Sequence, residues 1–349
     1  MPSILFRLQE LPRVGGLDRP LRSGYKGHTM TTKPSALLTL DGQHWLLDGR
    51  PFDLWGIRTA SGTMNDAQCR HLIDQFDDYL AHGVNAVTVF YQGCRGGNYD
   101  PFTPDGTAVD AGHQARMERI LQAAAGRGMV VIVGLFYQAA PITLADAAAV
   151  RNAVRTVTEA LRPYRNVILN VCNEPNSGEW KKFKAFDFND PRRVIDLCRL
   201  VHDIDGDRIV GGGGYDHAFN PVVGRSDDVD VLLFDTAGIE HTSGALFDRF
   251  RAEGVDGKPM VNVETFGGWT KQFPRGVFDE DVRAAYFREI DDALARPGLS
   301  VFFHNNPWCQ STTEPLRYDL GGYGTAGDPG IRWYFERVRE RRRTAGCRL

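Results

Sequence analysis

Short apolar runs rich in β-branched residues alternate with amphipathic stretches along this chain from about residue 52 onward. Turn residues bound each run, as expected for the buried strands of a parallel sheet. The runs predict eight strands at residues 52–57, 85–91, 129–136, 167–172, 208–211, 231–234, 260–263 and 299–304.

The stretches between these runs carry apolar side chains at helical spacing. Asn65 is the expected N-cap of the first helix, and Pro163 ends a long helix over residues 144–162. Other helices are expected around Met117 to Ala124, from Asp190 to Val201, and near residues 243–253, 279–295 and 330–343. Only the segment after the fifth strand, residues 215–226, has room for no more than a turn or a short helix. This regular alternation predicts the α/β class and a single (β/α)8 barrel.

A doubly wound nucleotide-binding sheet is the competing architecture. It requires a Gly-rich phosphate loop between its first strand and first helix. The glycine run of this chain, Gly211 to Gly214, instead follows the fifth strand and lacks the spacing of a phosphate loop. We therefore interpret it as a tight corner of a barrel.

Residues 1–34 are irregular in pattern, and Met30 lies just before the first regular segment. We expect an N-terminal extension there, either disordered or arising from a mis-assigned start, and one barrel domain over residues 35–349. The first 30 residues lack the apolar core of a signal peptide, and no run reaches the roughly 18 apolar residues of a membrane helix. These observations predict a cytoplasmic protein without a membrane partner.

Charge and cysteine usage exclude further classes. The 41 Lys and Arg residues nearly balance 44 Asp and Glu residues, so the basic surface of a nucleic-acid binder is not expected. Six cysteines without a CxxC pair predict reduced thiols rather than a disulfide framework or a metal ribbon. The first strand ends in Ile57-Arg58-Thr59 and not in a His-x-His pair, so we expect no catalytic metal and no cofactor.

Two glutamates follow buried strands directly. Glu174 comes after the fourth predicted strand and Glu264 after the seventh. In a barrel these strand ends face the mouth where active sites lie, and a carboxyl buried elsewhere without a partner is costly. A pair of carboxyls is what glycoside hydrolysis requires, one as a neutral acid and one as a carboxylate. From the residues alone, structural ion pairs and other barrel chemistries remain alternatives.

The sequence around these glutamates resembles a known family. The segment Asn173-Glu174-Pro175 resembles the strand-four Asn-Glu-Pro motif of clan A glycoside hydrolases, the family 5 cellulase-like group in particular. The segment Val261-Asn262-Val263-Glu264 resembles the strand-seven motif of the same clan, and the similarity covers residues 38–340.

The resemblance implies a role for each matching residue in a retaining hydrolysis of a β-linked glycan or oligosaccharide. Glu174 corresponds to the acid/base and Glu264 to the nucleophile. Asn173 corresponds to the donor to the sugar 2-hydroxyl, and Trp308 to the aromatic platform under the sugar ring. Arg58 resembles the arginine that keeps the nucleophile ionised.

The chain departs from the family after the sixth strand. The family has a His and a Tyr there, whereas this chain has Phe234-Asp235-Thr236, with His241 further along and Tyr215 after the fifth strand as a substitute. Polar and aromatic residues near other strand ends complete the candidate substrate-binding set: Tyr137, Tyr215, His217, Trp269 and His304. A transglycosylase and a non-catalytic carbohydrate-binding barrel are the alternative functions. Retention of both glutamates argues against the latter.

Overall fold

The computed structural model describes residues 36–93, 100–215, 217–236, 241–266, 276–305, 308 and 316–346. The expected extension over residues 1–34 and the candidate Trp269 lie outside these ranges.

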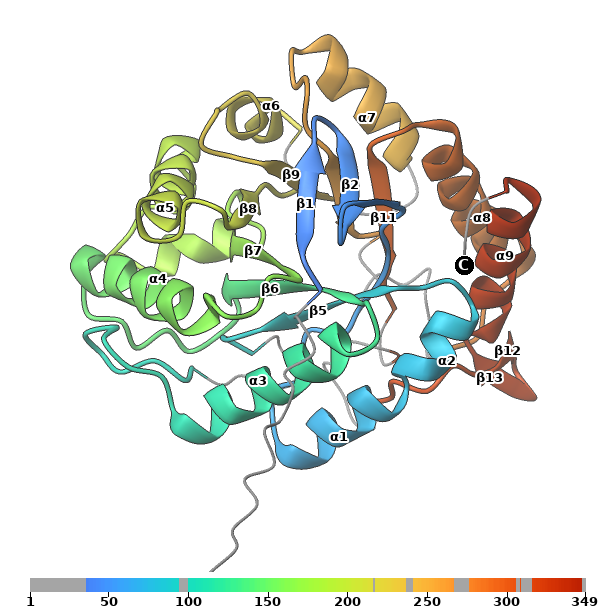
Figure 1. Cartoon of the computed structure of the whole chain (residues 1–349), viewed down its shortest axis with the longest axis horizontal. Helices are drawn as coiled ribbons and strands as arrows, with labels where there is room; N and C mark the ends of the chain where they lie inside the picture. The colour runs from blue at the N-terminus through green and yellow to red at the C-terminus, as the bar shows by residue number, and fades with distance from the viewer. Residues whose placement is uncertain are drawn as a thin grey trace, which may run out of the picture. The chain divides into compact units, whose positions relative to one another are not determined.

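The described chain forms a closed barrel of eight parallel strands (Figure 1). These strands are β4 (Trp55–Arg58), β5 (Ala86–Phe90), β6 (Val130–Phe136), β7 (Val167–Cys172), β8 (Ile209–Gly212), β9 (Val231–Asp235), β10 (Met260–Glu264) and β11 (Leu299–Phe303). Each pairs with its neighbours in chain order, and β11 closes the barrel on β4. The eight predicted strands and the (β/α)8 barrel are therefore confirmed.

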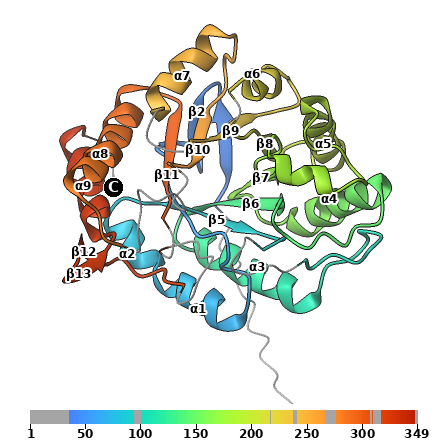
Figure 2. The same ribbon diagram turned by 180° about the vertical axis from the view of Figure 1, so that it is seen from behind.

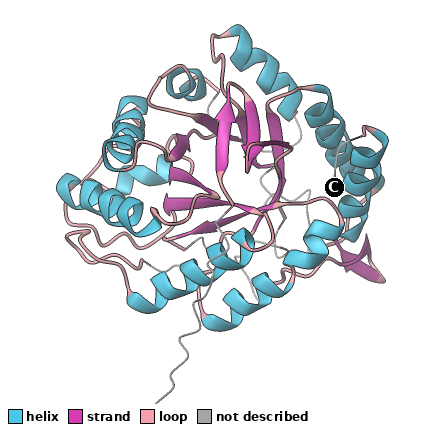
Figure 3. Ribbon diagram, viewed as in Figure 1, coloured by secondary structure: helices cyan, strands magenta, loops and turns pink. Residues whose placement is uncertain are grey.

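Helices surround the barrel, as Figures 2 and 3 show from behind and by element type. They are α1 (Asp66–Asp74), α2 (Phe76–Ala81), α3 (Ala111–Ala125), α4 (Ala147–Leu161), α5 (Pro191–Ile204), α6 (Phe219–Gly224), α7 (Ser243–Ala252), α8 (Glu280–Ala295) and α9 (Arg332–Thr344). Asn65 caps α1 as expected, because its side chain accepts from the backbone N–H of Gln68. The segment after the fifth barrel strand forms only the short α6, also as expected.

The barrel interior is filled by alternate residues of the strands. Ala86, Val130, Ile168, Val231 and Phe302 belong to one buried interior cluster. Gly56 leaves room for the Phe302 ring, since a Cβ at this position would lie 2.2 Å from that ring. The residues between them on each strand face outward and pack against the helices, as in a (β/α)8 core.

A small antiparallel sheet that the sequence analysis missed covers the end of the barrel where the strands begin. It consists of β1 (Leu38–Asp41), β2 (His44–Leu47) and β3 (Arg50–Phe52), and Figure 1 views the molecule from this side. Leu38 and Trp45 join the interior cluster. A second unpredicted hairpin, β12 (Gly321–Thr325) with β13 (Asp328–Gly330), precedes α9.

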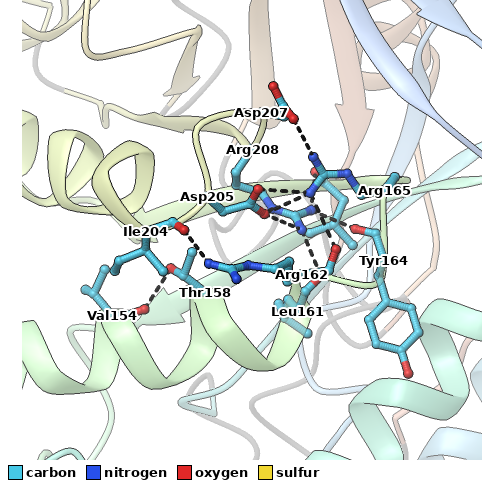
Figure 4. Close-up of polar contacts among 11 residues, drawn as sticks. Val154, Thr158, Leu161, Arg162, Tyr164, Arg165, Ile204, Asp205, Asp207 and Arg208 are labelled. Atoms are coloured by element: carbon cyan, nitrogen blue, oxygen red, sulfur yellow. Dashed lines mark hydrogen bonds and ion pairs between the residues drawn. The ribbon is translucent and has the colours of Figure 1, made fainter.

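A polar cluster ties together the loops before β7 and β8 at this same end (Figure 4). Asp205 accepts from Arg165 at 2.8 Å and forms an ion pair with Arg208 at 3.1 Å. The buried Arg208 also donates to the carbonyl oxygens of Leu161 and Tyr164, at 2.8 and 2.7 Å. These contacts satisfy carbonyl groups at the end of α4, at the end of the barrel opposite the candidate site.

Candidate active site

Glu264 turns into the barrel mouth because of a β-bulge. Val261 and Val263 both pack in the interior cluster, so strict alternation would direct Glu264 toward the helices. The register between β10 and β9 shifts between Asn262 and Glu264 and places Glu264 opposite Asp235. The extra residue of a bulge re-aims the side chains that follow it. Glu264 is consequently buried among the inward-facing side chains of the rim.

The side chain of Asn262 supports this bulge. Its Oδ1 accepts from the backbone N–H of Glu264 at 3.1 Å, and its Nδ2 donates to Thr236 Oγ1 at 3.1 Å and to Ser243 Oγ at 2.8 Å. Ser243, at the start of α7, is in turn hydrogen-bonded to the buried Glu289 of α8 through its backbone N–H and its hydroxyl. The backbone of Glu264 is thereby connected to two helices outside the barrel.

Two fully buried residues contact the carboxylate of Glu264. Arg58 Nη2 lies 3.1 Å from Oε2, and His304 Nδ1 lies 3.2 Å from Oε1. Burial lowers the pKa of His304 to about 4, so the imidazole is neutral and Nδ1 is the nitrogen that must carry the hydrogen for this bond. Burial alone would lower the pKa of Arg58, but Glu264 and the other nearby acids raise it above its ordinary value. Glu264 therefore has a permanent cation on one oxygen and a neutral donor near the other.

Glu174 lies in a tight turn just after β7. Its backbone φ of 42° falls in the left-handed region, where a residue with a side chain is strained. The indole N–H of the buried Trp180 donates to the carbonyl oxygens of Asn173 at 3.2 Å and of Glu174 at 3.0 Å. Gln138, after β6, donates to Glu174 Oε2. These bonds hold the turn and the carboxyl in a defined position.

One ion pair and a chain of hydrogen bonds join the two glutamates. Beyond its contact with Glu264, Arg58 Nη2 donates to Asn173 Oδ1 at 2.8 Å. Asn173 Nδ2 donates to Gln138 Oε1 at 3.0 Å, and Gln138 reaches Glu174. Because Asn173 and Gln138 are buried, the two carboxyls are held relative to each other by ordered side chains rather than by solvent.

Electrostatics distinguishes Glu174 from Glu264. Desolvation raises the pKa of Glu174 well above its ordinary value, and the charges of Glu264 and Asp235 add to this effect while Arg58 opposes it. The pKa of Asp235 is raised in the same direction by burial and by Glu264. The surroundings therefore favour a neutral Glu174, whereas Glu264 has a charged partner in Arg58.

The other described candidates, Tyr137, Tyr215 and His217, differ in exposure and in the rings that they contact. Tyr137 is buried and packs edge-on against Phe90, with ring centroids 5.4 Å apart, and Phe90 in turn lies under Arg58. Tyr215 is 37% exposed, and the ring of His217 packs edge-on against that of His241, 4.8 Å away. Their contacts with substrate stay predictions.

Trp308 is only 3% exposed. Its indole N–H donates to the carbonyl oxygen of Asp319 at 2.8 Å, and the guanidinium of Arg317 lies 4.9 Å from its ring centroid. The indole N–H is thus already bonded to backbone, so a sugar platform at this residue would act through its ring face. That role also stays a prediction.

Sequence reasoning did not select four residues that organise the site: Gln138, Trp180, Asp235 and Glu289. Gln138 and Asp235 stand at predicted strand ends, so their proximity to the mouth could be read from the sequence. Nothing in the sequence pattern singles out Trp180 or Glu289.

The described residues lack two features that are typical of other protein classes. Among the described residues, no group of three or more His, Cys, Asp or Glu side chains is arranged to hold a metal ion. Within the same ranges, no helix has both the length and the apolar composition needed to cross a bilayer.

The sequence matches no known family model and no curated protein. Solved structures do match the fold. A family 5 glycoside hydrolase from Bacteroides vulgatus is similar, with a TM-score of 0.56 and 14% identity. The match covers 77% of this chain and 62% of that enzyme. An endo-1,4-β-mannanase from Rhizomucor miehei gives a TM-score of 0.56 and 13% identity, covering 77% of this chain and 90% of that one.

A β-glucanase from Saccharophagus degradans is also similar, with a TM-score of 0.56 and 15% identity over 88% of this chain and 94% of that chain. At such identities the likeness is one of fold. The similarity to these glycoside hydrolases therefore extends over the barrel fold.

Proposed function

We propose that this protein is a retaining glycoside hydrolase acting on a β-linked glycan or oligosaccharide. The observation that carries the proposal is the unequal surroundings of two connected carboxyls. Glu264 contacts Arg58 and His304, whereas desolvation favours the neutral form of Glu174. The fold shared with the mannanase and the glucanase supports the same chemistry.

The reaction proceeds in two displacements. In the first, the Glu264 carboxylate attacks the anomeric carbon while Glu174 donates its proton to the departing glycosidic oxygen, which forms a glycosyl ester on Glu264. In the second, Glu174 removes a proton from water, and the water oxygen displaces Glu264 from the sugar. Transfer to a sugar hydroxyl in place of water would make the same site a transglycosylase.

Arg58 and His304 assist by holding the carboxylate of Glu264. Once the ester forms, the negative charge of Glu264 disappears, so the interaction with Arg58 is stronger before attack and after release. The chain through Asn173 and Gln138 keeps Glu174 in place for both proton transfers. A retaining enzyme separates the two carboxyls by about 5 to 5.5 Å, because no water has to fit between Glu264 and the sugar.

Mass spectrometry with activated 2-deoxy-2-fluoro β-glycosides tests this proposal. The gluco, manno, galacto and xylo members are each incubated with the protein, and any adduct is located by peptide mapping. We expect a one-sugar adduct on Glu264 with at least one member. Glu264→Gln should form no adduct, and Glu253→Gln, at the C-terminal end of α7, should react as the wild type does.

Three results would contradict the proposal. An adduct on Glu174 would reverse the two roles. Turnover with an inverted product would refute the covalent intermediate. Glycan binding without any turnover would favour a carbohydrate-binding barrel.

A further inference from the structure

Asp235 differs from the two glutamates of the site in its contacts. Glu264 is held by Arg58 and His304, and Glu174 by Gln138. Asp235 is only 3% exposed, yet its buried Oδ1 has no hydrogen-bond partner within the described part of the chain. Buried polar atoms nearly always have a partner, so this exception needs an explanation.

The backbone directs this carboxyl to the mouth of the barrel. Leu233 belongs to the interior cluster, and Asp235 lies two residues further along β9 on the same face. Its backbone N–H donates to the carbonyl oxygen of Gly214 at 3.2 Å, and the bulge of β10 sets it opposite Glu264. Asp235 is thus in the uppermost inward position of its strand.

The neighbouring strand contributes no side chain beside it. Residues 211–214, at the end of β8, are all glycine. A Cβ at Gly213 would lie 2.0 Å from the carbonyl oxygen of Leu233, so this edge requires glycine on steric grounds. The charge of Asp235 is one of the causes of the raised pKa of Glu174.

The described contacts of Arg58 and His304 go to other residues. Arg58 already contacts Glu264 and Asn173, and His304 contacts Glu264 through Nδ1. An unpaired buried carboxyl lowers stability, and enzymes retain such groups where a substrate completes the bond.

We propose that Asp235 is a specificity-determining residue whose carboxyl hydrogen-bonds to one hydroxyl or amino group of the sugar unit bound against Glu264. The inference rests on the proposed function, because it assigns a contact to the same substrate. In its neutral form the carboxyl donates to one sugar oxygen and accepts from a hydroxyl. In its ionised form it accepts from an ammonium group.

Kinetics with Asp235→Ala and Asp235→Asn test this assignment. The substrates are the 4-nitrophenyl glycoside identified by labelling, its monodeoxy analogues and its 2-amino analogue. We expect Asp235→Ala to lower kcat/KM for the parent glycoside by roughly 10- to 100-fold, as for loss of one buried hydrogen bond. One monodeoxy analogue should be insensitive to the substitution, and it identifies the hydroxyl that Asp235 binds.

The Asp235→Asn variant distinguishes a hydroxyl partner from an ammonium partner. It keeps the shape of the side chain with one donor and one acceptor, so a hydroxyl partner predicts a loss of less than roughly tenfold for Asp235→Asn. An ammonium partner predicts that the 2-amino analogue is the best substrate and that Asp235→Asn loses as much as Asp235→Ala. Asp207→Asn, at the opposite end of the barrel (Figure 4), is the matched control and should leave kcat/KM unchanged.

The proposal is overturned if Asp235→Ala turns over the parent glycoside as fast as the wild type, or if all analogues are slowed equally. Its failure is distinguishable from failure of the proposed function. If the wild type neither turns over any glycoside nor is labelled by one, the hydrolase assignment fails. The binding of wild type and Asp235→Ala to a glycan array is then compared. Weaker binding by the variant supports the sugar contact, and equal binding overturns it.

Discussion

Replacing Arg58 by Met isolates the charge that the site places beside Glu264. Methionine keeps an apolar stem of similar length but removes the guanidinium, which lies 3.1 Å from Glu264, 2.8 Å from Asn173 and 5.2 Å from the Phe90 ring centroid. Both partners of the ion pair are buried. Breaking a buried pair by removing one partner costs about 3–5 kcal/mol, because the other charge is left uncompensated.

A double-mutant cycle with Glu264→Gln separates this charge effect from lost packing. In the Glu264→Gln background the carboxylate that Arg58 contacts is absent, so Arg58→Met should cost about 2 kcal/mol less there than in the wild type. Urea unfolding of the wild type, the two single variants and the double variant gives the four free energies of unfolding. Arg127→Met, which removes an ion pair with the exposed Asp77, is the control and should unfold nearly as the wild type does.

Equal costs of Arg58→Met in both backgrounds, within about 0.5 kcal/mol, would refute the reasoning. Arg58 would then contribute through packing on Phe90 and through the bond to Asn173. The electrostatic account of Glu264 would lose its main support.

Two further predictions concern Glu289 and Trp180, buried residues whose hydrogen bonds support the candidate site. Burial raises the pKa of Glu289 from 4.5 to about 7, offset in part by its hydrogen bonds with Ser243. A carboxyl whose pKa is higher in the folded state makes stability fall as pH rises from the unfolded value through the folded one, so wild-type stability should decline between about pH 4.5 and 7. Thermal unfolding of Glu289→Gln at several pH values should lack this contribution, and an unchanged profile would contradict it. Trp180→Phe removes the donor shared by the carbonyl oxygens of Asn173 and Glu174, and should cost about 1–3 kcal/mol in urea unfolding and slow labelling of Glu264. Unaltered labelling would show that the turn holds Glu174 without this donor.

The barrel was predictable because its strands are buried on both faces and its helices are buried on one. These two conditions produce continuous apolar runs and amphipathic stretches, and both appear directly in the sequence. The β1–β3 sheet was missed although its turn signal is present. Asp48 and Gly49 have φ angles of 53° and 71°, and an Asp-Gly pair with positive φ at both residues is typical of a tight hairpin.

The candidate site was predictable only in part. Glu174 and Glu264 could be recognised because each follows a buried strand. The inward turn of Glu264 depends on a bulge, and a one-residue shift of register leaves no mark in the apolar pattern of β10. The chain from Arg58 through Asn173 and Gln138 depends on which strand ends become neighbours, and that follows only from closure of the barrel.

Several positions where local rules are broken lie at the candidate-site end of this barrel. Glu174 has a strained backbone, the pKa values of Glu174 and Asp235 are raised by desolvation, and Asp235 Oδ1 has no described partner. At the opposite end, Asp205, Arg165 and Arg208 form a cluster in which charges are paired and carbonyl groups are bonded. Natural proteins retain unfavourable local features mainly where function requires them. A buried apolar cluster fills the barrel between the two ends, and the burial of these acids at one end supports the proposal that a substrate binds there.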